Sequence, residues 1–242
     1  MEMFRFFPVA VFYLWVIIIR GEDIMASFDF GVKVDPLMFE KQLNTPCTVN
    51  IQDYIKQGWE MFKEHVGEFV GFTLILFVAY VVSSKLAFAG SFIISAVVAS
   101  LTAGYTIAAF KLMSGQQFEF ADFFKGFNYF LPLFLASLAG GFLVGIGLLL
   151  LLLPGIYLAV SYMFATFLII DYRMEFWQAL ETSRKIIAKN WFAFFGFAFA
   201  LFAINLLGCL ALGVGLLVTI PVTSCAAAIA YKEIAGLYSS DW

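Results

Sequence analysis

Charged residues and histidine are scarce in this chain of 242 residues. Asp, Glu, Lys and Arg together make up 13% of the sequence and His occurs once, whereas 63% of the residues are apolar. Soluble domains carry about 25% charged residues, and a soluble fold of this length has too little interior to bury so much apolar surface. The composition, with a mean hydropathy of +0.94, therefore predicts an integral membrane protein.

Few side chains have the chemistry of a catalytic or metal site. The single histidine is His65, and the three cysteines, Cys47, Cys209 and Cys225, lie too far apart for a Cys-x-x-Cys metal site. No motif of a serine hydrolase, a zinc peptidase or a P-loop occurs. A net charge of −3 without a basic cluster argues against nucleic acid as a partner. We expect no enzyme activity, no metal and no cofactor, although the Phe-rich faces leave room for a lipid, a carotenoid or a quinone.

Long apolar runs, in contrast, fill most of the chain. A membrane-spanning helix needs about 20 apolar residues, and the alternating segments of a β-barrel are not found here. The predicted fold class is therefore an all-α, polytopic transmembrane helix bundle, with a transmembrane domain at 50–242 after an N-terminal hydrophobic anchor and polar linker at 1–49. The six expected core spans are residues 69–84, 86–110, 129–153, 155–171, 191–208 and 209–231.

A further apolar run occupies residues 3–19. It is compatible with a signal peptide, a seventh span, an interfacial helix, or sequence upstream of a start at Met25. No small-x-small cleavage site follows the run, because the next residues are Arg20-Gly21-Glu22-Asp23. This favours a retained hydrophobic helix, and whether it spans the membrane or lies at its surface stays open.

The segments between the predicted spans differ in length and charge. Short turns are expected at Ser83-Ser84-Lys85, Pro154-Gly155 and Gly208-Cys209. Apart from Arg5 and Lys85, every Lys and Arg lies in the longer polar segments 20–65, 111–128, 172–190 and 232–242. Because positively charged loops stay on the cytoplasmic side, we predict a multi-pass protein of a bacterial inner membrane, with its long loops and C-terminus in the cytoplasm.

Two segments have an apolar and a polar face at helical spacing. The apolar face of the first is Ile51, Tyr54, Ile55, Trp59, Phe62, Val66 and Phe69. In the second, the apolar side is Trp177, Leu180, Ile187 and Trp191, and the basic side is Arg184, Lys185 and Lys189. One interpretation is a pair of interfacial helices, with aromatic side chains at headgroup level and cations on anionic lipid. The other is that both helices pack on the cytoplasmic face of the bundle.

These two helix-plus-span units align when the chain is shifted by 125 residues. The shift places Phe69, Gly71, Phe72, Leu76 and Phe77 on Phe194, Gly196, Phe197, Leu201 and Phe202. Since both units enter the membrane from the same side, the repeat is parallel, whereas inverted repeats are commoner in transporters.

Small residues indicate where helices approach each other closely in a membrane. They recur every four residues at Ser91, Ser95, Ala99 and Ala103, and as a Gly-x-x-x-Gly motif at Gly141 and Gly145. We expect both sets to pack within the molecule. Pro221, in the last span, removes a backbone donor and is expected to kink the helix.

Polar residues are rare within the predicted spans. No charged residue lies there away from the span ends, which argues against an ion-coupled transporter. Asn205 is the only strongly polar side chain in mid-span, and a hydrogen bond to a neighbouring helix explains it as well as a substrate site does. A cavity, if present, is expected between the repeat halves near Asn205, Tyr105 and Tyr157.

Several short motifs follow one another in order along the chain. They are Phe120-x-Asp122-Phe123-Phe124-Lys125-Gly126-Phe127, Pro154-Gly155-Ile156-Tyr157, Asp171, Trp177-x-Ala179-Leu180-x-x-Ser183, Gly213-x-Gly215 with Pro221, and Ala230-Tyr231. Over about residues 50–235 the chain thus resembles the uncharacterised bacterial six-helix integral membrane families grouped with the membrane domain of glycerophosphodiester phosphodiesterase. The resemblance implies a six-helix bundle with cytoplasmic amphipathic segments. It brings no established activity, and no soluble phosphodiesterase domain is present.

Two hypotheses for function follow. The first is a non-enzymatic accessory or scaffold subunit that docks to a larger membrane complex, with membrane lipids and other membrane protein subunits as partners. The alternative is a transporter or lipid-handling protein with a mid-membrane cavity. A polar cavity at that depth distinguishes the two, because a transporter needs one and a scaffold does not.

Overall fold

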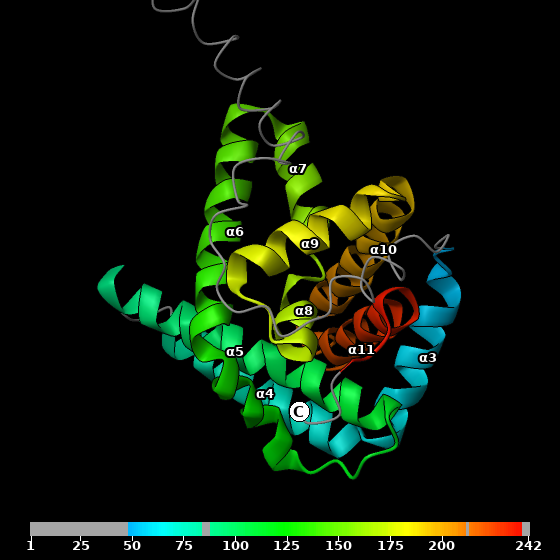
Figure 1. Cartoon of the computed structure of the whole chain (residues 1–242). Coiled ribbons are helices and arrows are strands. Elements are labelled where there is room, and N and C mark those ends of the chain that lie inside the picture. The colour runs from blue at the N-terminus through cyan, green and yellow to red at the C-terminus, as the bar shows by residue number, and fades with distance from the viewer. Residues whose placement is uncertain (1–47, 84–87, 212, 239–242) are drawn as a thin grey trace, which may run out of the picture.

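A computed structural model describes residues 48–83, 88–211 and 213–238, and within them every regular element is a helix (Figure 1). The elements are α3 (Ile51–Glu64), α4 (Val66–Ser83), α5 (Phe88–Met113), the 3-10 helix η1 (Phe120–Tyr129), α6 (Phe130–Leu150), α7 (Leu152–Ser161), α8 (Ala165–Tyr172), α9 (Phe176–Ala188), α10 (Trp191–Leu210) and α11 (Leu216–Ala235). The N-terminal run at 3–19, the linker up to Cys47 and the side chains of Ser91 and Ser95 lie outside the described residues.

Several of these helices are long and apolar enough to cross a membrane. The four candidate spans are η1 together with α6 (Phe120–Leu150), α7 together with α8 (Leu152–Tyr172), α10 (Trp191–Leu210) and α11 (Leu216–Ala235). A fifth candidate is the pair formed by α3 and α4, which is bent by 96° at the residue between them, His65. The described residues therefore form an all-helical, multi-pass membrane protein with four or five candidate spans, whereas the sequence predicts six.

Two of the predicted turns lie elsewhere. The helix α10 continues through Gly208 and Cys209 to Leu210, and the described turn residues beyond it are Ala211 and 213–215, where Gly213 has a φ of 76°. Gly208 instead packs against Thr219 of α11 and against Gly215, the residue before α11. Its lack of a side chain therefore permits a close contact between α10 and α11. The last span accordingly begins at Leu216, and α11 continues as one helix through Pro221.

The second displaced turn joins α6 to α7. Its only residue outside a helix is Leu151, and Pro154 lies in the first turn of α7. A proline is tolerated there because the first N–H groups of a helix have no partner within the helix.

The predicted span at 155–171 is not a single helix. It is divided into α7 and α8 by a turn at residues 162–164. No Pro or Gly stands in this turn, which is Tyr162-Met163-Phe164, so the local sequence gives no sign of the break.

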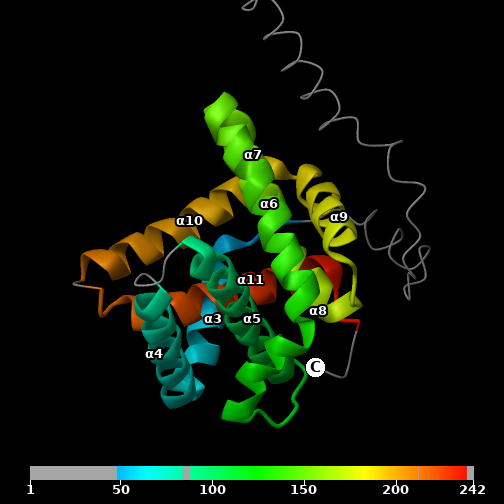
Figure 2. The same ribbon diagram turned by 90° about the vertical axis from the view of Figure 1, so that its left-hand side faces the viewer.

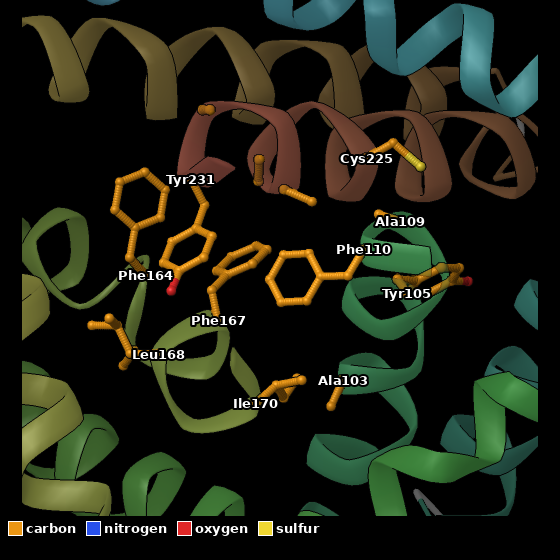
Figure 3. Packing of buried hydrophobic residues seen from close by; sticks show 14 of the residues in the cluster. Ala103, Tyr105, Ala109, Phe110, Phe164, Phe167, Leu168, Ile170, Cys225 and Tyr231 are labelled. Carbon is orange, nitrogen blue, oxygen red and sulfur yellow. The ribbon is translucent and has the colours of Figure 1, made fainter. Parts of the chain in front are cut away.

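The interior is built from buried aromatic rings. One group joins α4, α5 and η1, where Phe72 stacks on Phe123 at 4.1 Å and both contact Tyr105. A second group, shown in Figure 3, joins α5, α8 and α11, where Tyr231 packs against Phe167 at 5.3 Å and Phe110 at 5.6 Å. Such pairs add about 0.5–1.5 kcal/mol each beyond the burial of their area.

Two buried carboxylates connect the ends of the helices. Asp122 of η1 accepts the backbone N–H of Glu119 and forms ion pairs with Lys111 at 2.8 Å and Lys125 at 2.9 Å. Asp171 at the end of α8 accepts hydrogen bonds from the Tyr231 hydroxyl and from a backbone N–H of the C-terminal segment, each at 3.0 Å. These contacts fix the segments that lead into and out of the apolar helices.

The helices recur at the spacing that the sequence suggests. Val66 and Trp191, the first residues of α4 and α10, are 125 positions apart, and the preceding helices α3 and α9 have the same relation. The two aligned pairs of phenylalanines in α4 and α10, Phe69 with Phe194 and Phe72 with Phe197, are all fully buried.

The close helix contacts use glycines other than those of the Gly-x-x-x-Gly motif. A methyl group on Gly58 of α3 would lie 2.8 Å from the backbone N of Ala226 in α11, and one on Gly104 or Gly126 would overlap a carbonyl oxygen of the facing segment. A methyl group on Gly141 or Gly145 meets no described atom within 4 Å. The expected packing of these two glycines within the molecule is therefore wrong for the described residues, because they lie on an outward face of α6.

Candidate functional site: a hydroxyl-lined groove beside a broken helix

A groove of about 280 Å³ lies among α5, α8, α10 and α11. Its polar lining is Thr102, Thr106, Thr166, Asn205, Thr223 and Ser224. Its apolar lining is Met163, Phe167, Leu201, Phe202 and Ala227. The described lining holds no charged side chain, so the groove offers hydroxyl and amide groups among apolar walls.

Two of the polar groove residues lie inside their helices. Thr106 precedes the last residue of α5 by seven positions, and Asn205 follows the first residue of α10 by fourteen. At about 1.5 Å per residue, Thr106 is about 10 Å from the end of α5 and Asn205 about 21 Å from the start of α10. Met163 and Thr166 lie instead at and just after the turn between α7 and α8.

Asn205 has an unused acceptor in this groove. Its Nδ2 donates to the carbonyl of Leu201 and to the hydroxyl of Thr223, both at 3.1 Å, and thereby connects α10 to α11. Its Oδ1 is buried and accepts no hydrogen bond from any described residue. A buried acceptor without a partner is costly, so a bound molecule that donates a hydrogen bond to Oδ1 is stabilised here.

The break between α7 and α8 adjoins the groove, because Met163 in the break is part of the lining. Ser183 of α9 satisfies the backbone on both sides of it. The Ser183 hydroxyl donates to the carbonyl of Ser161 at 2.6 Å and accepts the N–H of Phe164 at 3.1 Å. Irregular backbone at membrane depth is tolerated only where it is buried in protein or lines a cavity, and both conditions are met here.

The residues predicted to lie at the membrane interface are in different environments. In α3, Trp59 is 43% exposed, whereas Phe62 is 3% exposed and packs in the core. In α9, Trp177 is half-buried and Lys185 is exposed, as is Lys189 directly after the helix.

The interpretation of Arg184 as a cation that contacts anionic lipid is wrong, because its side chain is buried and paired within the protein. Its guanidinium forms two hydrogen bonds to Glu181, at 2.6 Å and 2.9 Å. These bonds raise the pKa of Arg184, so the guanidinium stays protonated. The exposed cations of this segment are Lys185 of α9 and Lys189, which follows the helix.

Of the three residues expected at a cavity, the structure brings only Asn205 to the groove. The Tyr105 hydroxyl is buried 2.7 Å from that of Thr73, between α4 and α5. The Tyr157 ring stacks on Trp191 at 5.8 Å. The hydroxyl residues of the lining were not singled out from the sequence, although the i, i+4 spacing of Thr102 and Thr106 was a usable signal. Ser183 was named from the sequence only as the last residue of a motif, without a structural role.

A second, wider hollow of about 780 Å³ lies between α3 and the ends of α5 and α11. Its lining is Asp53, Lys56, Gln57, Glu60, Met61, Glu64, Leu112, Met113, Ile229, Lys232 and Glu233. This lining contains four carboxylates and two lysines. Among the described residues no group of three or more His, Cys, Asp or Glu side chains is placed to hold a metal ion. The uncharged groove is therefore the better candidate site.

Comparison with known proteins gives no further guide. A scan against protein-family models, a search of curated proteins and a search of solved structures each return no match. The groove and the helices around it are therefore the features from which we infer function.

Proposed function

We propose that this protein is a non-enzymatic membrane protein that binds an uncharged amphiphile in the hydroxyl-lined groove, as a transporter or a lipid-handling protein does. The observation that carries the proposal is the groove itself, with hydroxyl and amide groups from four helical segments and a buried, unpaired Asn205 Oδ1. A few placed polar groups in an apolar pocket are the usual composition of a small-molecule site.

The lining indicates the chemistry of the ligand. Without a charged side chain in the described lining, a charged group would be desolvated with no partner. Asn205 Oδ1 requires a donor, so the ligand carries a hydroxyl or amide group. The volume of about 280 Å³ suits a polar head or a small molecule rather than a whole phospholipid.

The interrupted helix is a second line of support. Discontinuous membrane helices form the substrate sites of many transporters, because a helix break exposes backbone groups to the ligand. Here the break between α7 and α8 contributes Met163 to the groove, and Thr166 follows it in the first turn of α8.

Native mass spectrometry of the gently solubilised protein tests the proposal. We expect the wild type to retain a lipid-soluble molecule of fixed mass, and Asn205→Leu or Thr106→Val to bind it about tenfold more weakly through the loss of one buried hydrogen bond. Leu207→Ala, at an exposed position of α10, is the control and should retain the molecule. Equal retention by all four proteins, or no bound molecule in the wild type, would contradict the proposal.

A second candidate function is that of an accessory subunit in a larger complex, with other membrane protein subunits as partners. The observation that favours it is the open face of α6 at Gly141 and Gly145, where no described atom would touch an added methyl group. Gly-x-x-x-Gly faces allow close approach between membrane helices. The proposed location is a bacterial inner membrane with the C-terminus in the cytoplasm.

Sizing of the protein extracted from its native membrane tests this second candidate. We expect stoichiometric subunits to co-migrate with the wild type and to be lost in Gly145→Leu and after deletion of residues 1–49. Leu138→Ala, at another exposed position of the same helix, serves as the control and should keep them. A lone 27.1 kDa species with bound lipid would eliminate the accessory role and leave the groove as the functional site.

A further inference from the structure

The hairpin of α6 and α7 ends in an unusual apolar tip. Both views show it projecting beyond the other described helices (Figures 1 and 2). Six leucines in succession, Leu148–Leu153, form the turn and its flanks. We call residues Leu148–Leu153 the leucine tip. The side chain of Leu149 is 86% exposed and that of Leu153 is 79% exposed.

The exposed side chains belong to both helices of the hairpin. Phe142, Leu148 and Leu149 of α6 are exposed together with Leu152 and Leu153 of α7. No polar side chain occurs in the sequence from 138 to 156. An exposed apolar surface of this length without a polar residue matches the environment of a lipid-embedded segment.

The two helices of the hairpin meet closely at the turn. A methyl group on Gly147 would lie 2.9 Å from the Cα of Gly155. The N–H of Leu151 donates to the carbonyl of Gly147 at 3.0 Å, and Pro154 has no N–H to satisfy. The hairpin therefore ends in a narrow, tightly packed turn.

The length of the hairpin agrees with a tip at membrane depth. The 21 residues of α6 extend about 32 Å at about 1.5 Å per residue, close to the hydrocarbon thickness of about 30 Å. The charged residues nearest its foot are Asp122 and Lys125 of η1. With Phe130 at one boundary, the leucine tip lies near the opposite end of the hydrocarbon layer.

We propose that the leucine tip lies within the hydrocarbon layer and contacts lipid acyl chains, so that the turn between α6 and α7 is not an aqueous loop. The hairpin then enters and leaves from one side of the membrane, and its tip occupies the far leaflet. This inference does not depend on the groove.

Fluorescence quenching in phosphatidylcholine nanodiscs, which leave both membrane faces open to solvent, tests the depth of the tip. The full chain, with Cys47, Cys209 and Cys225 replaced by serine, carries one dye at Leu151→Cys or, as a second variant, Leu153→Cys. Ser114→Cys, in the polar turn after α5, is the matched control. We expect doxyl groups on the acyl chains to quench the tip dyes, and aqueous iodide to quench only the control.

Iodide quenching of the tip dyes equal to that of the control would overturn the proposal, because the turn would then lie in water. Quenching by neither reagent would also overturn it, because a protein surface, such as a second copy of the chain, would then cover the tip. The Ser114→Cys protein, measured in parallel, shows that iodide reaches the polar surface of the protein.

Discussion

Gly126→Ala is expected to prevent η1 from docking on α5 and to lower the yield of folded protein severely. The added methyl group would overlap the carbonyl oxygen of Ser100 and lie 3.3 Å from the Cβ of Ala103. Because the clash is with backbone, no side-chain rotation relieves it, and we expect a loss of about 3 kcal/mol in stability. The same applies to Gly104→Ala, whose methyl group would overlap the carbonyl oxygen of Phe123.

The measurement is the monodisperse yield and the thermal midpoint in detergent. Gly145→Ala is the matched control, since it makes the same chemical change where no described atom lies within 4 Å. We expect the control to match the wild type. A Gly126→Ala protein with the midpoint of the control would mean that η1 does not pack on α5 as described.

Ser183→Ala is expected to destabilise the break between α7 and α8. The hydroxyl serves two buried backbone groups, the carbonyl of Ser161 and the N–H of Phe164, and alanine leaves both without their partner. A buried polar group left unsatisfied costs about 1–3 kcal/mol. Since Met163 and Thr166 line the groove beside this turn, ligand retention should fall together with the thermal midpoint.

Thr182→Ala is the control for this change, because Thr182 is the preceding residue of α9 and is only partly buried. Ser183→Thr keeps the hydroxyl and should recover part of the loss. If Ser183→Ala and Thr182→Ala melt at the same temperature, the bridge to the two backbone groups does not stabilise the fold.

The long apolar helices were predictable from the sequence, whereas their interruptions were not. The start of the span at Trp191 coincides with the predicted one, because a long apolar run follows polar residues there. The break at 162–164 has no local signal, since its backbone is satisfied by Ser183, about twenty positions further along the chain. Long-range hydrogen bonds of this kind depend on how α9 packs, which the sequence of α7 and α8 does not encode locally.

The helix contacts made by small residues also depend on long-range packing that the local sequence does not show. The Gly-x-x-x-Gly spacing drew attention to Gly141 and Gly145, but spacing within one helix does not show which face meets a neighbour. The close contact instead pairs Gly104 with a segment around Gly126, on opposite sides of a polar turn. Of the groove residues only Asn205 was identified from the sequence, because Thr and Ser side chains can bond to their own helix and need no site to explain them.

The recurrence of α3–α4 as α9–α10 makes the contrast between Gly58 and Ser183 informative, because these two residues are also 125 positions apart. In one copy of the unit, glycine lets α3 touch the backbone of α11. In the other, serine at the corresponding place bonds to the backbone on both sides of the turn between α7 and α8. The two stretches thus share buried phenylalanines and differ at this buried position. If the groove binds a ligand as we propose, Gly58 belongs to the stretch that closes the scaffold and Ser183 to the stretch that shapes the wall of the site.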